Sequence, residues 1–248
     1  MNLQEYNKVK ELKYLEYCDY LQKKYGIGKC DYMTKSWNLN PKCKRTSEGL
    51  VAHHKYEDHA IMLSTKMFAM LNPFEWQKAE NIVYCDYLEH LFLHILICEN
   101  PSKEKNRNED VGTGGIVNFI APELNDLYSG WETKQQWRKN MHDKVRNDKD
   151  VYLALIKRFK DFQKIIIDIK VQIQINNKLA EIISDNTIPE EKSKEIQEKL
   201  KNDSFVKKLK KDTFENFLET KLLKSYNEEY GLWSKKNNKE IFDEIRKL

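Results

Sequence analysis

The chain has 248 residues, of which 40% are hydrophobic and 33% are charged, so it can bury one sizeable core or two small ones. Its formal net charge of +4 is too small to indicate a nucleic-acid partner by itself, although the basic excess lies entirely in residues 151–248. No apolar run reaches the roughly 18 residues of a membrane span and the first residues lack a signal-peptide pattern, so we expect a cytoplasmic protein with no membrane contact.

The first element expected along the chain is a helix. Residues 3–25 carry apolar and aromatic side chains at helical spacing, and Gly26 follows where such a helix would end. Residues 38–41 form a loop that leads into a first strand at residues 50–54. The cysteines have an odd count and form no C-x-x-C pair, so we expect five reduced, mostly buried thiols.

Five of the six histidines lie between His53 and His94, and four of them form two pairs of different spacing. The first pair, His53 and His54, ends the expected strand. Neighbouring side chains of a strand point to opposite faces, so we expect one imidazole to bind a metal and the other to face substrate. The second pair, His90 and His94, lies on an expected helix over residues 87–96. Residues four apart share one helical face, with about 5 to 6 Å between Cβ atoms, close enough to hold one ion.

Three segments around these histidines occur in a recognisable order, namely Glu48-Gly49-Leu50-Val51-Ala52-His53-His54, then Asn81-Ile82-Val83-Tyr84, then Glu89-His90-Leu91-Phe92-Leu93-His94. Together they resemble the HNH family of the His-Me finger (ββα-metal) endonucleases, which includes the colicin DNases and many phage and restriction nucleases. The resemblance covers residues 45–99 and implies a ββα-metal core. The interval from His54 to Asn81 is longer than in the minimal motif. We therefore expect an insertion there, with a short helix within residues 60–70.

The resemblance implies a role for each residue of the motif. His53, His90 and His94 would bind the metal, His54 would be the general base, and Asn81 would brace the loop. A neutral imidazole accepts a proton from water near neutral pH, while a metal stabilises charge on the phosphoryl and leaving oxygens. Three imidazoles favour Zn, Ni, Co or Mn, and Mg is abundant in cells. The expected cofactor is one divalent ion from these five.

Further candidates lie around this motif and in the C-terminal region. Glu57 and His59 could orient a ligand histidine, and Arg45 could contact a phosphate, but solvated turn residues and a surface arginine are the simpler interpretations. The candidate nucleic-acid contacts are Lys157, Arg158, Lys207, Lys208, Lys210 and Lys211. Lysine and arginine side chains neutralise phosphates, although a solvated helix face explains each group of neighbouring basic residues equally well.

The rest of the chain is predicted to be mainly helical. Residues 111–115 are glycine-rich and indicate a flexible connection, after which Pro122 opens a helix. Trp131 and Trp137 begin another helical stretch and are interpreted as core residues rather than base-stacking platforms. Residues 165–175 alternate as a strand does but also carry a helical stripe, so both assignments stay open, with helix preferred. The other helices are expected at residues 151–164, from Pro189, at 205–224 and at 239–247.

These patterns predict an α+β, predominantly α-helical protein. The expected ranges are 1–44 (N-terminal helix and loop), 45–99 (ββα-metal core), 100–150 (linker and helices packing on the core) and 151–248 (helical, binding DNA or a partner chain). The expected function is metal-dependent endonuclease action on DNA, in restriction, phage defence or a phage, with RNA as a second substrate class. Cleavage of both strands would indicate a homodimer. The alternatives are a nuclease toxin with a neutralising partner and an inactive, metal-stabilised binding module.

Overall fold

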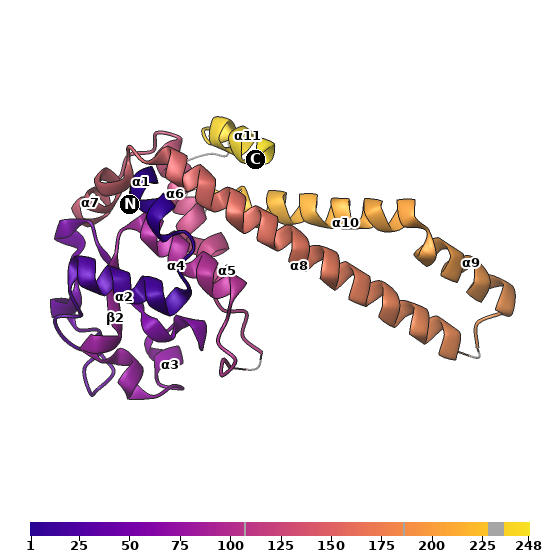
Figure 1. The fold of residues 1–248 in the computed structure, drawn as a ribbon, viewed down its shortest axis with the longest axis horizontal. Coiled ribbons are helices and arrows are strands. Elements are labelled where there is room, and N and C mark those ends of the chain that lie inside the picture. Colours follow the sequence, from indigo (N-terminus) through magenta and orange to yellow (C-terminus); the bar gives the residue numbers. More distant parts are fainter. Residues whose placement is uncertain (107, 186, 228–235) are drawn as a thin grey trace. The chain divides into compact units, whose positions relative to one another are not determined.

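The computed structural model describes residues 1–106, 108–185, 187–227 and 236–248 (Figure 1). These residues are mostly helical and include one small antiparallel sheet, which confirms the predicted α+β class with a predominance of helix. Contacts divide the chain into two compact units. Unit 1 comprises residues 1–157 and 223–248, and unit 2 comprises residues 158–222. The division therefore falls after Lys157 rather than at residue 151, and the C-terminal helix belongs to unit 1.

The sheet and the helix after it lie within three residues of their expected positions. Strand β1 (Val51–His54) pairs antiparallel with β2 (Ile82–Cys85), with His53 opposite Val83. Helix α4 (Tyr87–Glu99) begins directly after β2, because the Asp86 side chain accepts hydrogen bonds from the amides of Leu88 and Glu89. Helix α4 is buried on nearly every side, as expected of a helix that is apolar all round.

Two N-terminal helices pack against α4, where the sequence predicted a single helix over residues 3–25. That prediction is wrong, because α1 (Leu3–Val9) and α2 (Tyr14–Tyr25) are separated by a short break. The amide of Lys13 donates to the Glu16 carboxylate at 2.8 Å and so starts a new helix. The break allows aromatic rings from both helices, Tyr6 and Tyr17, to contact Phe92 of α4, with ring centroids 5.6 and 4.7 Å away.

The expected insertion between the strands is present and is built mainly from short turns. It contains 3₁₀ turns at Lys55–Asp58, Phe74–Gln77 and Ala79–Asn81, and helix α3 (Lys66–Ala69) lies within the range where a short helix was predicted. The strands on either side of the insertion pair along their full length, from Val51 opposite Cys85 to His54 opposite Ile82.

The segment after α4 folds back over it. It comprises α5 (Thr113–Gly115), a π-helix (Ile116–Ile120), α6 (Ala121–Tyr128) and α7 (Gln136–Val145). Of the glycines predicted to form a flexible connection, Gly114 and Gly115 lie in α5, and Gly112 is the residue before it. Trp131 is buried as expected, but Trp137 is 48% exposed, so its assignment to the core is wrong. The buried face of α7 repeats at helical spacing from Arg138 to Val145, and Trp137 lies about 100° away from Arg138 around the helix.

Unit 2 is helical. It includes residues 165–175, which the sequence left open between strand and helix. Helix α8 (Lys149–Ser184) runs through residues 165–175 without a break. Its buried stripe of Ile167, Val171 and Ile175 packs against side chains from α9 (Glu190–Lys201) and α10 (Asp203–Phe217). Figure 1 shows α10 running alongside α8. The packing of this stripe against α9 and α10 therefore selects the helix over the strand. A π-helix (Leu218–Leu222) follows, and α11 (Lys239–Lys247) belongs to unit 1.

Two further expectations concern the cysteines and the membrane. All five cysteines are free thiols, and all except Cys30 are buried, as predicted. Within the described ranges, no helix combines the length and apolar character needed to cross a bilayer.

Candidate metal centre

Three histidine side chains, one from β1 and two from α4, converge in one cluster. The ring centroids of His53 and His90 are 5.3 Å apart, those of His53 and His94 are 5.3 Å apart, and those of His90 and His94 are 4.8 Å apart. The end of β1 faces the first turns of α4 because the helix begins immediately after the partner strand β2. The two histidine pairs of the sequence thus supply three side chains to one cluster.

Glu57 adds a carboxylate to this cluster. The ligand atoms of His53, Glu57, His90 and His94 all lie within 4.8 Å of one another. One Glu57 oxygen is 3.4 Å from His53 Nδ1 and 3.3 Å from His94 Nε2. The interpretation of Glu57 as a solvated turn residue is therefore wrong. The 3₁₀ turn after β1 folds residue 57 back toward His53, a turn that strand or α-helix periodicity does not reveal.

The outer contacts of two histidines fix which ring nitrogens face inward. The Tyr14 hydroxyl lies 2.8 Å from His53 Nε2 and 3.1 Å from the Lys55 carbonyl. It can therefore accept a hydrogen bond from the Nε2–H of His53 and donate one to that carbonyl. The lone pair of His53 Nδ1 then points into the cluster. His94 Nδ1 is 3.2 Å from the Gly112 carbonyl, which leaves its Nε2 facing inward. Such second contacts orient the histidines of metal sites.

The residues of the cluster fit a divalent ion. The buried Nδ1 atoms of His53 and His90 have no hydrogen-bond partner, and His94 Nε2 lies only 3.2 Å from His90 Nε2. Unpartnered buried nitrogens cost free energy, which coordination of an ion would recover. Three imidazole nitrogens and one carboxylate oxygen form a donor set that zinc and related transition metals bind. The cluster can therefore hold one metal ion.

The protonation states of these residues also suit a metal. Burial lowers the pKa of His53 to about 3 and the pKa of His90 well below its usual value, so both rings are neutral at pH 7. Burial alone would raise the pKa of Glu57, but the neighbouring His53, His54 and His94 outweigh it and hold that pKa well below its usual range. Neutral imidazoles and an ionised carboxylate are the forms that coordinate metals.

His54 lies outside the cluster, as expected for the neighbour of His53 on a strand. It is fully buried, with Nε2 3.1 Å from Gln77 Oε1 and Nδ1 3.4 Å from a Glu57 oxygen. The edge of its ring contacts Tyr32, with centroids 4.5 Å apart. It does not line the cavity described next, so the expectation that His54 itself faces substrate is not met. His54 instead touches the centre through Glu57.

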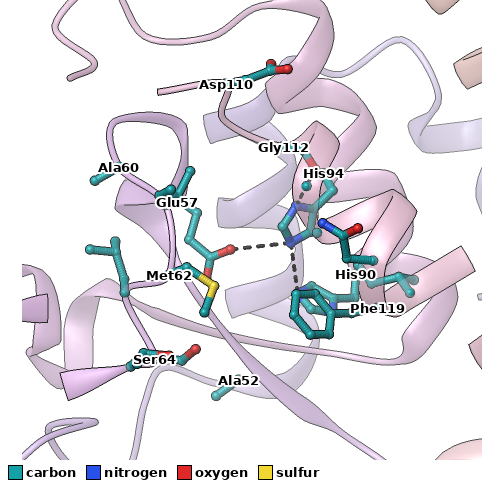
Figure 2. A pocket seen from close by; sticks show the side chains of 17 residues that line it. Ala52, Glu57, Ala60, Met62, Ser64, His90, His94, Asp110, Gly112 and Phe119 are labelled. Carbon is teal, nitrogen blue, oxygen red and sulfur yellow. Dashed lines mark hydrogen bonds and ion pairs between the residues drawn. The ribbon is translucent and has the colours of Figure 1, made fainter. Parts of the chain in front are cut away.

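A cavity of about 460 Å³ opens beside the cluster. Figure 2 shows Glu57, His90 and His94 on its wall, joined by the Glu57–His94 and His94–His90 contacts. The remaining wall comes from the insertion, at residues 60–65, and from the segment that covers α4, at residues 110–120. None of the described residues that line this cavity is a lysine or an arginine.

The other residues of the predicted site stabilise the surrounding fold. The Asn81 amide donates to the Glu75 carbonyl at 2.7 Å and so ties the end of the insertion together. His59 contacts Asp58 at 2.6 Å and the Ser102 hydroxyl at 3.1 Å.

Arg45 has a structural role of the same kind. It donates to the Tyr25 carbonyl at 2.6 Å, pairs with Glu48, and lies over the Tyr84 ring at 4.6 Å. It is therefore a partly buried packing residue rather than a surface arginine.

The basic residues proposed as nucleic-acid contacts lie on α8 and α10. Lys207, Lys208 and Lys211 are exposed, while Lys210 is half-buried. Lys208 pairs with Asp212 and Lys211 with Glu215, each four residues further along α10. Lys157 is exposed and Arg158 is half-buried at the end of unit 1 and the start of unit 2. Pairs spaced this way are typical of a solvated helix face, and nucleic-acid binding by these residues stays a prediction.

Gly115 provides a test of how His94 is held. A Cβ atom built on Gly115 would lie 2.4 Å from His94 Cε1, whereas one on Gly114 would have Asn118 as its nearest neighbour, at 3.8 Å. We expect Gly115→Ala to displace the His94 ring and to weaken Zn²⁺ binding about tenfold or more. Gly114→Ala, the matched control in the same turn, should bind as the wild type does. Isothermal titration calorimetry would measure both, and equal affinities would contradict the packing argument.

The evidence for a metal centre is therefore the order of the histidines along the chain, the convergence of their side chains and their protonation states. Strand β1 and helix α4 supply the histidines, a short turn supplies the carboxylate, and Tyr14 and Gly112 orient two of the rings. Comparison with known proteins finds no match to this chain among protein-family models, curated proteins or solved structures.

Proposed function

We propose that this protein is a metal-dependent endonuclease that hydrolyses phosphodiester bonds in nucleic acid, with DNA as the first substrate to test. The observation that carries the proposal is the convergence of His53, His90 and His94 where a two-stranded antiparallel sheet meets the helix that follows it. The HNH resemblance assigns these same three residues to the metal. The adjoining cavity supports the proposal, because it gives a ligand access to the cluster.

In this proposal, His53, His90 and His94 would hold a divalent ion, while Tyr14 and Gly112 keep two of the rings in place. Such an ion would supply Lewis-acid chemistry at the phosphate oxygens. Glu57 is ionised and lines the cavity, so it can accept a hydrogen bond from the attacking water.

His54 acts as the base through Glu57. The Gln77 side-chain amide donates to the Leu63 carbonyl at 3.1 Å, which turns its oxygen toward His54 Nε2. His54 therefore carries a proton on Nε2, and its basic Nδ1 faces Glu57. A proton taken from water by Glu57 can pass to Nδ1. The resulting imidazolium would be held by Gln77 on one side and the carboxylate on the other.

The test compares wild type, His54→Ala and His94→Ala on plasmid DNA, single-stranded DNA and RNA with Mg²⁺, Mn²⁺, Zn²⁺, Ni²⁺ or Co²⁺. We expect wild type to cut, His54→Ala to keep the metal but lose cleavage, and His94→Ala to lose both. His59→Ala, whose ring contacts Asp58 and Ser102 outside the cluster, is the control and should retain both. An inactive wild type with all five ions, or a fully active His54→Ala, would refute the proposal.

A second candidate is a metal-stabilised binding module without turnover. The full burial of His54 and the lack of lysine and arginine among the described cavity-lining residues favour it. The two candidates differ in the wild type itself. A binding module gains thermal stability from the ion yet cleaves no nucleic acid, whereas the endonuclease does both.

A further inference from the structure

A second cavity, of about 440 Å³, adjoins the first. Phe119 lines both, so its ring forms part of the wall between them. The second cavity is bordered by aromatic side chains from several elements, among them Tyr87 at the start of α4, Trp137 on α7 and Tyr226. Both cavities are formed by residues of unit 1.

Two aromatic rings at these cavities remain open to solvent. Phe119 is 47% exposed and Trp137 is 48% exposed, although each lies on an element whose other apolar residues are buried. Phe119 stands on the π-helix Ile116–Ile120, where Ile116, Val117 and Ile120 face the core. Such π-helical turns occur frequently at functional sites. Exposed rings beside a candidate reaction centre are available to stack on a flat ligand.

Apart from the metal centre itself, the described walls of the two cavities offer no free cationic side chain to a phosphate. The first cavity has no lysine or arginine among its described lining residues. In the second, the Arg138 guanidinium donates through Nε and Nη2 to the Glu123 carboxylate and through Nη1 to Asn227, and the group lies over the Tyr226 ring at 4.9 Å. This arginine is therefore neutralised. The ligand portion that fits is flat, uncharged and apolar on its faces.

The polar residues of the walls suit a ligand with a hydrogen-bonding edge. Asn118, next to Phe119, lines the first cavity, and Gln135 lines the second. Side-chain amides bind the edges of nucleobases, and aromatic rings stack on base faces largely regardless of sequence. A base within a duplex is stacked on both faces and cannot enter either cavity unless it is unpaired or flipped out.

We propose that the substrate is single-stranded nucleic acid, bound with one unpaired base in each cavity and with Phe119 between the two bases. This inference rests on the proposed endonuclease function and specifies its substrate class. His90, His94 and Glu57 lie on the wall of the first cavity, so the backbone of a nucleotide whose base enters there passes beside the metal centre. Trp137 stacks on the base in the second cavity.

The test measures binding separately from cleavage. Fluorescence anisotropy with dye-labelled oligonucleotides in EDTA compares single-stranded DNA, single-stranded RNA and duplex DNA of one sequence. We expect at least one single strand to bind tighter than the duplex. Phe119→Ala and Trp137→Ala should each weaken that binding roughly tenfold, the effect of removing one stacking ring. Phe119→Tyr and Trp137→Phe should retain it, because they keep a ring.

Phe68→Ala is the matched control, because Phe68 is 37% exposed but lines neither cavity. It should bind as the wild type does. The inference is overturned if the duplex binds as tightly as both single strands, or if Phe119→Ala and Trp137→Ala bind the single strand as the wild type does. Failure of the endonuclease function has a different signature. In that case the wild type cuts no nucleic acid with any ion, whatever the anisotropy shows.

Discussion

Replacing His94 with alanine is expected to abolish binding of a divalent ion and the thermal stabilisation that accompanies it. The substitution removes a nitrogen that lies 3.2 Å from His90 Nε2 and 3.3 Å from the Glu57 carboxylate. An ion present at a hundred times its Kd adds about 2.7 kcal/mol to the free energy of unfolding. For a domain of this size, that corresponds to a rise in Tm of roughly 5–10 °C. Wild type should show this rise, and His94→Ala should show none.

The measurement pairs calorimetric titration with thermal melts in EDTA and in Zn²⁺. Circular dichroism of both proteins in EDTA checks that His94→Ala folds, so that loss of binding is separated from loss of structure. His59→Ala serves as the control, since this histidine is not among the clustered ligands. Unchanged affinity in His94→Ala would show that the four side chains do not form one site.

Acidification is expected to destabilise the metal-free protein between pH 6.5 and about 3. Burial lowers the pKa of His53 to about 3, whereas an exposed histidine of the unfolded chain titrates near 6.5. Between these values the unfolded chain binds more protons at this position than the folded protein does. The free energy of unfolding therefore falls by about 1.4 kcal/mol for each unit of pH. The His53 contribution is complete above pH 6.5, and on the order of 5 kcal/mol is lost by pH 3.

Two neighbours act in the same direction. The pKa of His90 is lowered by burial, so it also favours unfolding as pH falls below 6.5. The pKa of Glu57 is lowered as well, and its contribution is lost below its ordinary value near 4.5. Guanidinium denaturation in EDTA at several pH values would measure the slope. His53→Gln should reduce it by about 1.4 kcal/mol per pH unit. The same slope in both proteins would contradict the assignment to His53.

The elements that hold the histidines could be predicted because their patterns are local. The strand before His53, the strand after Asn81 and the apolar helix containing His90 and His94 each have a short period that sequence displays directly. The break between α1 and α2 escaped prediction, because the apolar residues on both sides of Lys13 continue one helical spacing. Segment 165–175 remained open for a related reason. Its isoleucines satisfy both periods, and only packing against α9 and α10 selects the helix.

The site was harder to predict where it depends on contacts between distant segments. Glu57 joins the cluster through a 3₁₀ turn, and Tyr14 reaches His53 from a helix 39 residues earlier in the chain. Trp137 looked like a core residue because tryptophan is usually buried, but the core face of α7 is filled by the residues that follow it. Hydrophobic composition indicates that a residue can be buried, whereas the rotation of its helix decides whether it is.

The insertion between β1 and β2 contributes to both the metal centre and the cavity, but through different residues. Its first turn supplies Glu57 to the cluster, while residues 60–65 shape the cavity wall. The histidines come from the strand before the insertion and the helix after it, so changes confined to residues 60–65 can alter which ligand fits without moving the four clustered side chains. Loop grafting at residues 60–65 offers a route to new selectivity on an unchanged metal scaffold.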